Sequence, residues 1–326
     1  MHFADWLVFL GVRTFTKLFA WLGPGMGYGV VRVAGCLWYT LFRRRRLIIR
    51  RNLQIAFGDT MSAAERRRIG LLCCQHALAT IADIAVRDRL VTKETWRQFI
   101  SSDASLEAAL ATENPRGVAI LSGHLGSWEM GQYYWGLRDA PVSPVMRSLD
   151  NPYLDRESTR RRTRFGGTVI RKRGALLQIR EVLRNGGRVA IPADQSGPPD
   201  GMVTSFFGYP THVHSSYARI LLRQGCDLFF CVCVRDKGLS FRFQLVTQKL
   251  SVPSKGDLDE RSLALVRSYH EALELVIRRY PEQYLWMHRK WRHQPEGFPS
   301  AYESLEKSFV EHCTDAKSPQ GAVPRT

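Results

Sequence analysis

His124 and Glu129 are the two residues whose types and spacing most directly suggest chemistry, and they stand in Gly-His-Leu-Gly-Ser-Trp-Glu. A histidine can take a proton from a hydroxyl group, and a nearby carboxylate can fix its tautomer and stabilise the imidazolium that forms. Five residues along an ideal helix rotate by about 140°, so the side chains can meet only if His124 lies in the turn before the helix. The same spacing is common by chance, and taken alone it favours a capping histidine followed by a glutamate at a helix start.

The residues around this pair predict a strand before it and a helix after it. Residues 118–122 are a short apolar run, and residues 124–137 follow a helical pattern rich in Trp and Tyr. In sheets of this kind, ligands gather beyond the carboxyl ends of the strands, which is where His124 falls. The start of the helix is also expected to offer free backbone N–H groups to a developing oxyanion.

Strands and helices alternate through the rest of the body. Further strands are expected over 142–146, 168–170, 188–192, 227–234 and 240–246. Helices are expected within 62–112, including 104–111, and over 175–184, 213–223 and 260–280. Ser62 and Glu65 have the spacing of a capping box. The alternation predicts an α/β fold with a mixed, mostly parallel central sheet flanked by helices.

The amino-terminal residues predict a membrane-associated helical region. Two apolar runs, 4–22 and 26–42, contain several charges and are separated by Gly-Pro-Gly, so neither reaches the roughly 20 uncharged residues of a typical spanning helix. Arginines follow at 43–46, 50 and 51. This order fits an interfacial anchor whose arginines lie against anionic headgroups on the cytoplasmic side. Two other interpretations of this region are a single tilted membrane span and a pair of core helices with a solvated basic edge.

The net charge of the chain indicates what kind of partner it binds. The chain has 47 basic and 30 acidic residues, a formal charge of +17, which favours an anionic partner. No zinc-finger spacing, helix-turn-helix or ribonucleoprotein aromatic motif is evident, so nucleic acid is not the expected partner. The apolar aromatic amino terminus favours an anionic membrane surface.

The cysteines and histidines do not predict a metal site. Seven cysteines are present, an odd number with no Cys-x-x-Cys pair, which is typical of free thiols in a reducing compartment. His212 and His214 lie close together, but no cysteine or carboxylate stands nearby at ligand spacing. We therefore expect no metal.

The segment around His124 resembles the first signature of the late acyltransferases of lipid A biosynthesis, the lauroyl/myristoyl acyltransferase family within the lysophospholipid acyltransferase superfamily. Four other segments are similar to blocks of that family in the same order: Arg-Asn-Leu-Gln-Ile-Ala-Phe at 51–57, Arg-Ser-Leu-Asp-Asn-Pro-Tyr-Leu-Asp at 147–155, Ile-Pro-Ala-Asp-Gln at 191–195 with Phe-Phe-Gly at 206–208, and Pro-Glu-Gln-Tyr-Leu-Trp-Met-His-Arg at 281–289. The resemblance spans roughly residues 15–300.

The resemblance implies an enzyme of the bacterial inner membrane whose catalytic domain faces the cytoplasm. Such an enzyme moves a fatty acyl chain from an acyl carrier protein, or from coenzyme A, to a hydroxyl of a lipid A precursor or related membrane lipid. It implies His124 as general base, Glu129 as its partner, and no metal or organic cofactor.

Further residues are candidates for substrate binding: Arg147, Arg173, Asp194, Gln195, Phe207 and Gly208. Arg147 could bind a phosphate of the acceptor or form a surface ion pair. Arg173 belongs to a basic run that either contributes to the same phosphate-binding surface or is simply solvated. Asp194 and Gln195 follow a predicted strand. If the strands are parallel, they lie at the same edge of the sheet as His124, although both residue types are also typical of a turn. Phe207 and Gly208 suit an acyl-chain groove or a core turn.

Two departures from the family pattern bear on the acceptor. Arg147 is followed by Ser rather than the commoner Pro, and arginines at 156, 160, 161, 162 and 164 form an unusually heavy cluster. An acyltransferase for another membrane lipid (a phospholipid, glycolipid or amino-acid lipid) is therefore an alternative, as is a lipid-binding relative without catalysis. We expect residues 1–58 to form the membrane-associated region, 59–300 the acyltransferase domain and 301–326 a tail that is flexible from 316.

Overall fold

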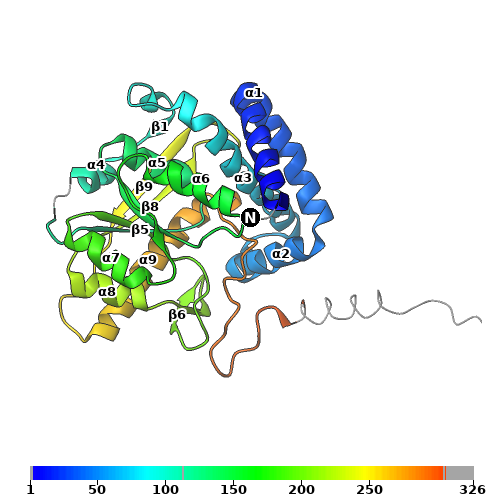
Figure 1. Cartoon of the computed structure of the whole chain (residues 1–326). Coiled ribbons are helices and arrows are strands. Elements are labelled where there is room, and N and C mark those ends of the chain that lie inside the picture. The colour runs from blue at the N-terminus through cyan, green and yellow to red at the C-terminus, as the bar shows by residue number, and fades with distance from the viewer. Residues whose placement is uncertain (1–2, 112–113, 304, 306–326) are drawn as a thin grey trace, which may run out of the picture.

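The computed structural model describes residues 3–111, 114–303 and 305 (Figure 1). Its helices are α1 (Phe3–Leu41), α2 (Arg43–Phe57), α3 (Ala63–Leu90), α4 (Ala104–Ala111), α5 (Trp128–Leu137), α6 (Pro152–Thr163), α7 (Ala175–Arg184), α8 (Ser216–Gln224) and α9 (Leu258–Arg279), with short 3-10 turns η1 (Gly58–Thr60), η2 (Trp96–Gln98) and η3 (Pro281–Gln283). Its strands are β1 (Ile100–Ser101), β2 (Val118–Ser122), β3 (Val142–Met146), β4 (Ile170–Arg171), β5 (Arg188–Pro192), β6 (Met202–Phe206), β7 (Tyr209–Val213), β8 (Asp227–Arg235) and β9 (Phe243–Lys249).

The central sheet has the strand order β1-β9-β8-β2-β5-β3-β4. The pairing of β8 with β9 is antiparallel, and the other neighbours are parallel. Helices lie on both faces of this sheet (Figure 1). The expected α/β fold with a mixed, mostly parallel sheet flanked by helices is therefore confirmed.

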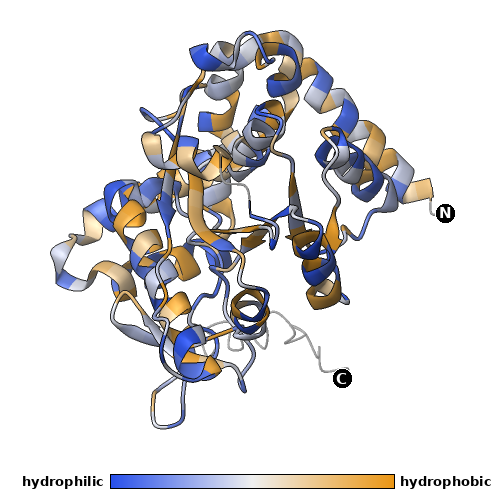
Figure 2. Cartoon of the chain, turned by 90° about the vertical axis from the view of Figure 1, so that its left-hand side faces the viewer, coloured by the Kyte–Doolittle hydropathy of each residue, from blue (hydrophilic) through white to orange (hydrophobic). Residues whose placement is uncertain are grey.

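The strands are apolar on both faces because both faces are covered. On β2, Val118 and Ile120 pack into the cluster that contains α4 and α5 residues. Ala119 and Leu121 pack into the opposite cluster with residues of α7, α8 and α9. Figure 2 shows hydrophobic residues concentrated on these central strands. Such strands read as continuous apolar runs, which is why β2 could be predicted with its correct bounds.

The amino-terminal runs form α1, which is two helical arms separated by a kink at Gly23. Gly23 has a φ of 71° and Pro24 follows it, so the predicted break between the two apolar runs is confirmed. α1 packs against α3, and the two backbones approach closely at Gly35, where a Cβ would lie 2.8 Å from the Cα of Gln75. At its start, α1 also reaches α6, because the Asn151 side chain donates to the backbone oxygen of Asp5 (2.7 Å).

The outer surface of α1 is rich in large apolar side chains. The exposed ones are Phe3, Trp6, Leu7, Val8, Leu10, Val12, Phe15, Leu18, Trp21, Met26, Val30, Val33, Leu37 and Leu41. Most of the exposed large hydrophobic side chains of the described residues thus belong to this one helix. Exposed apolar side chains gathered on one element are typical of a site of membrane or protein contact.

α3 is the one helix of the described residues that is long and apolar enough to cross a membrane. More than half of that stretch is buried inside the protein, so length and composition alone do not make it a span. The predicted capping box at its start is confirmed, since Ser62 accepts from the Glu65 N–H and the Glu65 carboxylate accepts from the Ser62 N–H.

Three regions of regular structure were not predicted. The short strand β1 lies within 62–112, where helices were expected, because the chain leaves α3 at Leu90 and pairs with β9 before α4 begins. α6 begins at Pro152 with Asn151 as its N-cap, in a stretch that the sequence presents mainly as an arginine cluster. β6 and β7 pair as an antiparallel hairpin outside the main sheet. The tail expected from residue 316 lies outside the described residues.

Candidate active site

The loop that carries His124 connects β2 to α5, so the predicted strand before it and helix after it are confirmed, although the helix begins at Trp128 and not at residue 124. It is held by backbone hydrogen bonds to two other segments. The His124 oxygen accepts from Leu285 (3.0 Å), and the Ser127 N–H donates to the Cys233 oxygen (2.7 Å). Gly126 has a φ of 65°, and a Cβ there would lie 2.1 Å from the same Cys233 oxygen, so this turn requires glycine.

Asp194 is the carboxylate that binds His124. β2 and β5 are parallel neighbours, with Ser122 opposite Pro192, so the loops after both strands leave the same edge of the sheet. His124 Nδ1 lies 2.9 Å from Asp194 Oδ1, and the His124 backbone N–H donates to Asp194 Oδ2 (3.0 Å). The second contact fixes the carboxylate as well as the ring. With Nδ1 donating to Asp194, the other ring nitrogen, Nε2, is the one left to act as a base.

The two groups stabilise each other's charged forms. Burial by itself lowers the pKa of His124, but the charge and hydrogen bond of Asp194, together with the charge of Glu129, outweigh it and raise that pKa above its ordinary value. Burial by itself raises the pKa of Asp194, but the His124 charge and hydrogen bonds hold it well below its usual range. Asp194 is therefore ionised at neutral pH, and an imidazolium at His124 is stabilised.

The partner expected for His124 was Glu129, and its side chain is bound elsewhere. Glu129 lies in the first turn of α5 and pairs with Arg162 of α6 and with Arg87 of α3, whose Nη1 is 3.5 Å from Oε2. Burial raises the pKa of Glu129, but the two arginines outweigh that effect and lower it. Among the hydrogen bonds of the described residues, none joins His124 to Glu129. The carboxylate turns toward the arginines because they face it from both neighbouring helices.

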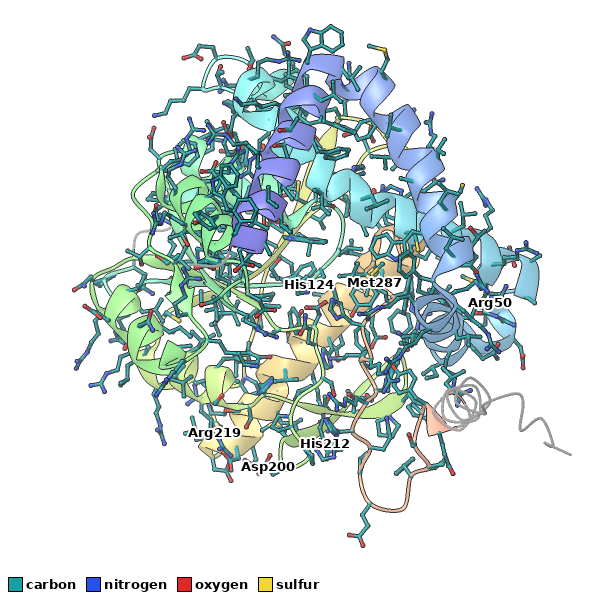
Figure 3. All side chains as sticks on the ribbon, turned by 45° about the vertical axis from the view of Figure 1, so that its right-hand side comes forward. Arg50, His124, Asp200, His212, Arg219 and Met287 are labelled. Carbon is teal, nitrogen blue, oxygen red and sulfur yellow. The ribbon has the colours of Figure 1, made fainter. Side chains whose placement is uncertain are left out.

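Two aromatic rings lie beside His124, one from the start of α5 and one from the carboxyl-terminal segment. The His124 ring packs edge-on against Trp128, with ring centres 5.2 Å apart, and lies 5.5 Å from the ring of His288. Burial and the charge of His124 lower the pKa of His288. Figure 3 shows His124 near Met287, whose backbone oxygen accepts from Arg45 at the start of α2 (3.3 Å). One arginine of the amino-terminal cluster thus lies beside the site.

The two candidate phosphate-binding arginines lie at the same edge of the sheet. Arg147 follows β3 and Arg173 follows β4, and both strands run parallel to β5 and its neighbours. Both side chains are exposed, and Arg147 makes an ion pair with the exposed Asp150 (3.0 Å). The surface ion pair weighed for Arg147 is therefore present. Gln195 is also exposed, beside the buried Asp194.

Phe207 and Gly208 form the turn between β6 and β7. Phe207 is buried, and its ring packs against Phe57 (5.4 Å between ring centres), Phe206 and Trp286. Its backbone N–H donates to Glu274 (2.7 Å). Gly208 has a φ of 71°, which favours glycine at the turn. The structure thus places Phe207 within an aromatic core cluster.

Lys290 is a buried cation near Asp194 that the sequence reasoning missed. Its Nζ lies 3.3 Å from Nε2 of His270. Burial lowers the pKa of Lys290 to about 8, against the opposing charges of Asp194 and Glu274. The available sequence signal was its position directly after the carboxyl-terminal block 281–289, two residues beyond His288.

The described residues contain no group of three or more histidine, cysteine or acidic side chains arranged to hold a metal ion. His212 instead has its Nδ1 3.0 Å from the Gly201 oxygen. The described cysteines are free thiols, most of them buried. Cys231 and Cys233 share one face of β8 and pack into one core cluster.

The fold and site define a class: an α/β protein with a histidine–carboxylate pair beyond the carboxyl ends of two parallel strands and an apolar amino-terminal helix beside it. The chain belongs to the bacterial lipid A biosynthesis acyltransferase family, whose sequence model matches residues 1–293. It is therefore an acyltransferase, and the family resemblance is confirmed.

Individual relatives agree along nearly the whole chain. The lipid A biosynthesis lauroyltransferase of Escherichia coli (strain K12) is 23% identical over 312 residues, covering 93% of this chain and 96% of that protein. The lipid A biosynthesis palmitoleoyltransferase of the same organism is 26% identical over 317 residues, with the same coverage. A lipid A biosynthesis acyltransferase of Shigella flexneri is also 26% identical. Since these relatives are named for different acyl chains, the similarity supports the family and not one chain length.

Proposed function

We propose that this enzyme transfers a fatty acyl chain from the thioester of an acyl carrier protein, or of coenzyme A, to a hydroxyl of a lipid A precursor. The observation that carries the proposal is the pair of His124 and the buried Asp194 at the open edge of the sheet. His124 keeps part of its side chain exposed, so an acceptor hydroxyl can reach its ring, while its Nδ1 is already engaged by the carboxylate.

In the proposed reaction, Nε2 of His124 takes the proton of the acceptor hydroxyl as the oxygen attacks the thioester carbonyl carbon. The tetrahedral intermediate collapses, the carbon–sulfur bond breaks, and the departing thiolate receives the proton from the imidazolium. The products are an ester and a free thiol. Asp194 holds the ring and stabilises the imidazolium through a direct hydrogen bond. Glu129 adds to that stabilisation through its charge.

Backbone N–H groups are the proposed donors to the oxyanion. In the His124 loop, the N–H groups of Leu125, Gly126 and Ser127 already donate to backbone oxygens. The next two, those of Trp128 and Glu129, lie in the first turn of α5, where an α-helix provides no acceptor of its own. These two groups are therefore our candidates for the oxyanion hole.

The acceptor is proposed to enter from the bacterial inner membrane, with the catalytic domain on the cytoplasmic side. The exposed apolar side chains of α1 would lie in the interfacial region, and the arginines that begin α2 would face anionic headgroups. Arg147 and Arg173 are proposed to bind phosphate groups of the acceptor, because they lie at the sheet edge that carries His124.

Acyl transfer by purified protein tests this proposal. The protein is incubated with labelled acyl carrier protein thioester, or acyl-CoA, and with lipid A precursor or total bacterial phospholipid in separate reactions. We expect ester formation on the lipid A precursor, and a fall of at least about a hundredfold for His124→Ala, the usual scale for losing an acid–base group. His293→Ala, which changes a partly exposed histidine of another segment, is the matched control. Unchanged transfer by His124→Ala would contradict the mechanism, and transfer only to phospholipid would contradict the acceptor.

A further inference from the structure

α3 carries a stripe of four buried polar side chains on one face of the helix. His76, Thr80, Asp83 and Arg87 follow one another at spacings of four, three and four residues, which places them on one face of the helix. Each is at most 3% exposed. None of the residues proposed for the acyl-transfer steps belongs to this stripe, so its role needs a separate explanation.

The stripe holds the segment that connects His124 to α5. The Thr80 hydroxyl donates to the backbone oxygen of Gly126 (3.0 Å). The Ser127 hydroxyl donates to Asp83 Oδ2 (2.6 Å), and Arg87 Nη1 donates to the backbone oxygen of Glu129 (2.8 Å). Three successive members of the stripe thus bind three positions that follow His124 by two, three and five residues.

Asp83 is the centre of this arrangement because each of its oxygens binds a different part of the molecule. Oδ2 accepts from Ser127 and forms an ion pair with Arg235 at the end of β8. Oδ1 accepts from the Tyr28 hydroxyl of α1 (2.7 Å). The carboxylate therefore joins α1, the central sheet and the His124 loop.

The backbone of Arg235 is also connected to the His124 loop, through Gln283. The Gln283 side chain binds both the N–H (2.8 Å) and the oxygen (2.9 Å) of Arg235. The backbone oxygen of Gln283 accepts from Gly126 (3.0 Å). The loop is therefore fixed from both sides by groups that converge on the Asp83–Arg235 pair.

Stability alone is a weak reason to bury such a pair. Asp83 and Arg235 are both 0% exposed, and removing two charges from water costs free energy that largely cancels the gain from their attraction. Well-packed apolar residues can fill such a position at no loss of stability, whereas they cannot fix the orientation of a hydroxyl or a loop. The contacts of Asp83 fix the orientation of hydroxyl groups and of a loop in this way.

We propose that Asp83 is a positioning residue for the His124 loop, and that the Tyr28 hydrogen bond makes this position depend on the seating of α1 against α3. The proposal rests on the proposed function, because α1 is the helix whose exposed apolar surface would contact the membrane. Docking of α1 at a lipid surface would then favour the loop geometry in which His124 faces its substrate.

Tyr28→Phe is the sharpest test, because it removes one hydroxyl and keeps the ring. Tyr39→Phe is the matched control, since Tyr39 is an equally buried tyrosine of α1 whose hydroxyl contacts Arg50 of α2 instead. With enzyme bound to anionic phospholipid vesicles, we expect Tyr28→Phe to lower kcat about tenfold, the scale of a hydrogen bond to a charged group, with KM for the acyl donor unchanged. Tyr39→Phe should keep the wild-type kcat.

A double-mutant cycle distinguishes positioning from general loss of packing. Ser127→Ala removes the hydroxyl on the other side of Asp83. If both hydroxyls act through Asp83 on one loop, the Tyr28→Phe/Ser127→Ala double variant should lose little more kcat than the worse single variant. Losses that multiply, or a Tyr28→Phe variant that matches Tyr39→Phe, would overturn the proposal.

Hydrogen–deuterium exchange gives a readout that does not depend on acyl transfer. Backbone amides of residues 123–129 should exchange faster in Tyr28→Phe than in wild type or Tyr39→Phe, on the same vesicles. Equal exchange in all three proteins would overturn the positioning role. If the wild type transfers no acyl group at all, the proposed function fails, and this exchange measurement still decides the inference about Asp83.

Discussion

Asp194 and Glu129 are both buried carboxylates whose charges act on His124, yet they lie in different surroundings. Asp194 follows β5 and binds the backbone N–H and the ring of one histidine. Glu129 lies on α5 and is paired with two arginines, Arg162 and Arg87, from two other helices. The two carboxylates thus differ in whether their nearest positive charge is permanent.

This difference separates two roles. In the proposed reaction, His124 becomes positively charged only when it takes the proton. The attraction of Asp194 for the His124 imidazolium therefore increases during the reaction. The charge of Glu129 is already balanced by arginines, so it mainly holds α3, α5 and α6 together beside the loop. We therefore expect substitutions of Asp194 to lower activity more than stability, and substitutions of Glu129 to do the reverse.

Asp194→Asn should have the largest effect. It keeps the size of the side chain but removes the charge that orients and stabilises the His124 ring, so kcat should fall about a thousandfold. The control is Asp200→Asn, an exposed aspartate in the same loop after β5. Steady-state acyl transfer measures both variants, and a loss below about threefold for Asp194→Asn would remove Asp194 from the mechanism.

Glu129→Gln should change stability more than chemistry. It leaves Arg162 and Arg87 without their buried counter-charge, so the free energy of unfolding should fall by about 3 kcal/mol. The kcat should fall about tenfold, because the charge of Glu129 also supports the imidazolium. Urea unfolding and acyl transfer measured on the same preparation check both numbers. A larger loss of kcat here than in Asp194→Asn would reverse the roles that we assign to the two carboxylates.

The pH dependence of the wild-type enzyme follows from the raised pKa of His124. A general base must be neutral, so kcat/KM should rise with pH as His124 loses its proton. Burial lowers this pKa, but Asp194 and Glu129 outweigh burial, so the midpoint should lie above the ordinary histidine value of about 6.5. A midpoint below that value, measured between pH 5 and 9, would contradict the electrostatic description of the site.

Arg147→Gln and Arg173→Gln should have the smallest effects. Both arginines are exposed, so each should raise KM for a phosphorylated acceptor by about fivefold and leave kcat unchanged. Arg219→Gln is the control, because Arg219 is a partly exposed arginine paired with Asp259 on α9, away from this sheet edge. Equal KM values for all three variants would remove these arginines from the acceptor site.

The sequence was sufficient to predict the body of the fold wherever burial on both sides produced continuous apolar runs. β2, β3 and β5 begin and end at the predicted residues. α6 was missed because it has no buried apolar stripe, and it contacts α3 and α5 through Arg161 and Arg162 instead. Asn151 and Pro152 are nevertheless a typical helix start. The β6–β7 hairpin was missed because it mixes polar residues with a turn at Phe207, where the φ is 53°.

The site was predictable to the level of the sheet edge. Parallel strands bring the residues after β2 and β5 together, and this rule placed Asp194 near His124. The choice between two carboxylates depended on Arg87 and Arg162, which lie 42 and 33 residues from Glu129 in the chain. Contacts between such distant elements depend on how the helices pack, and the spacing of His124 and Glu129 gives no information on that packing.

A titration of His124 by ¹⁵N nuclear magnetic resonance tests the central claim most directly, because it observes the ring without a substrate. In wild type we predict a proton on Nδ1 in the neutral form and a pKa above the ordinary value. Asp194→Asn should lower this pKa more than Glu129→Gln does, since Asp194 contributes both a hydrogen bond and a charge. A neutral ring protonated on Nε2, or a larger decrease in Glu129→Gln, would contradict the pairing of His124 with Asp194.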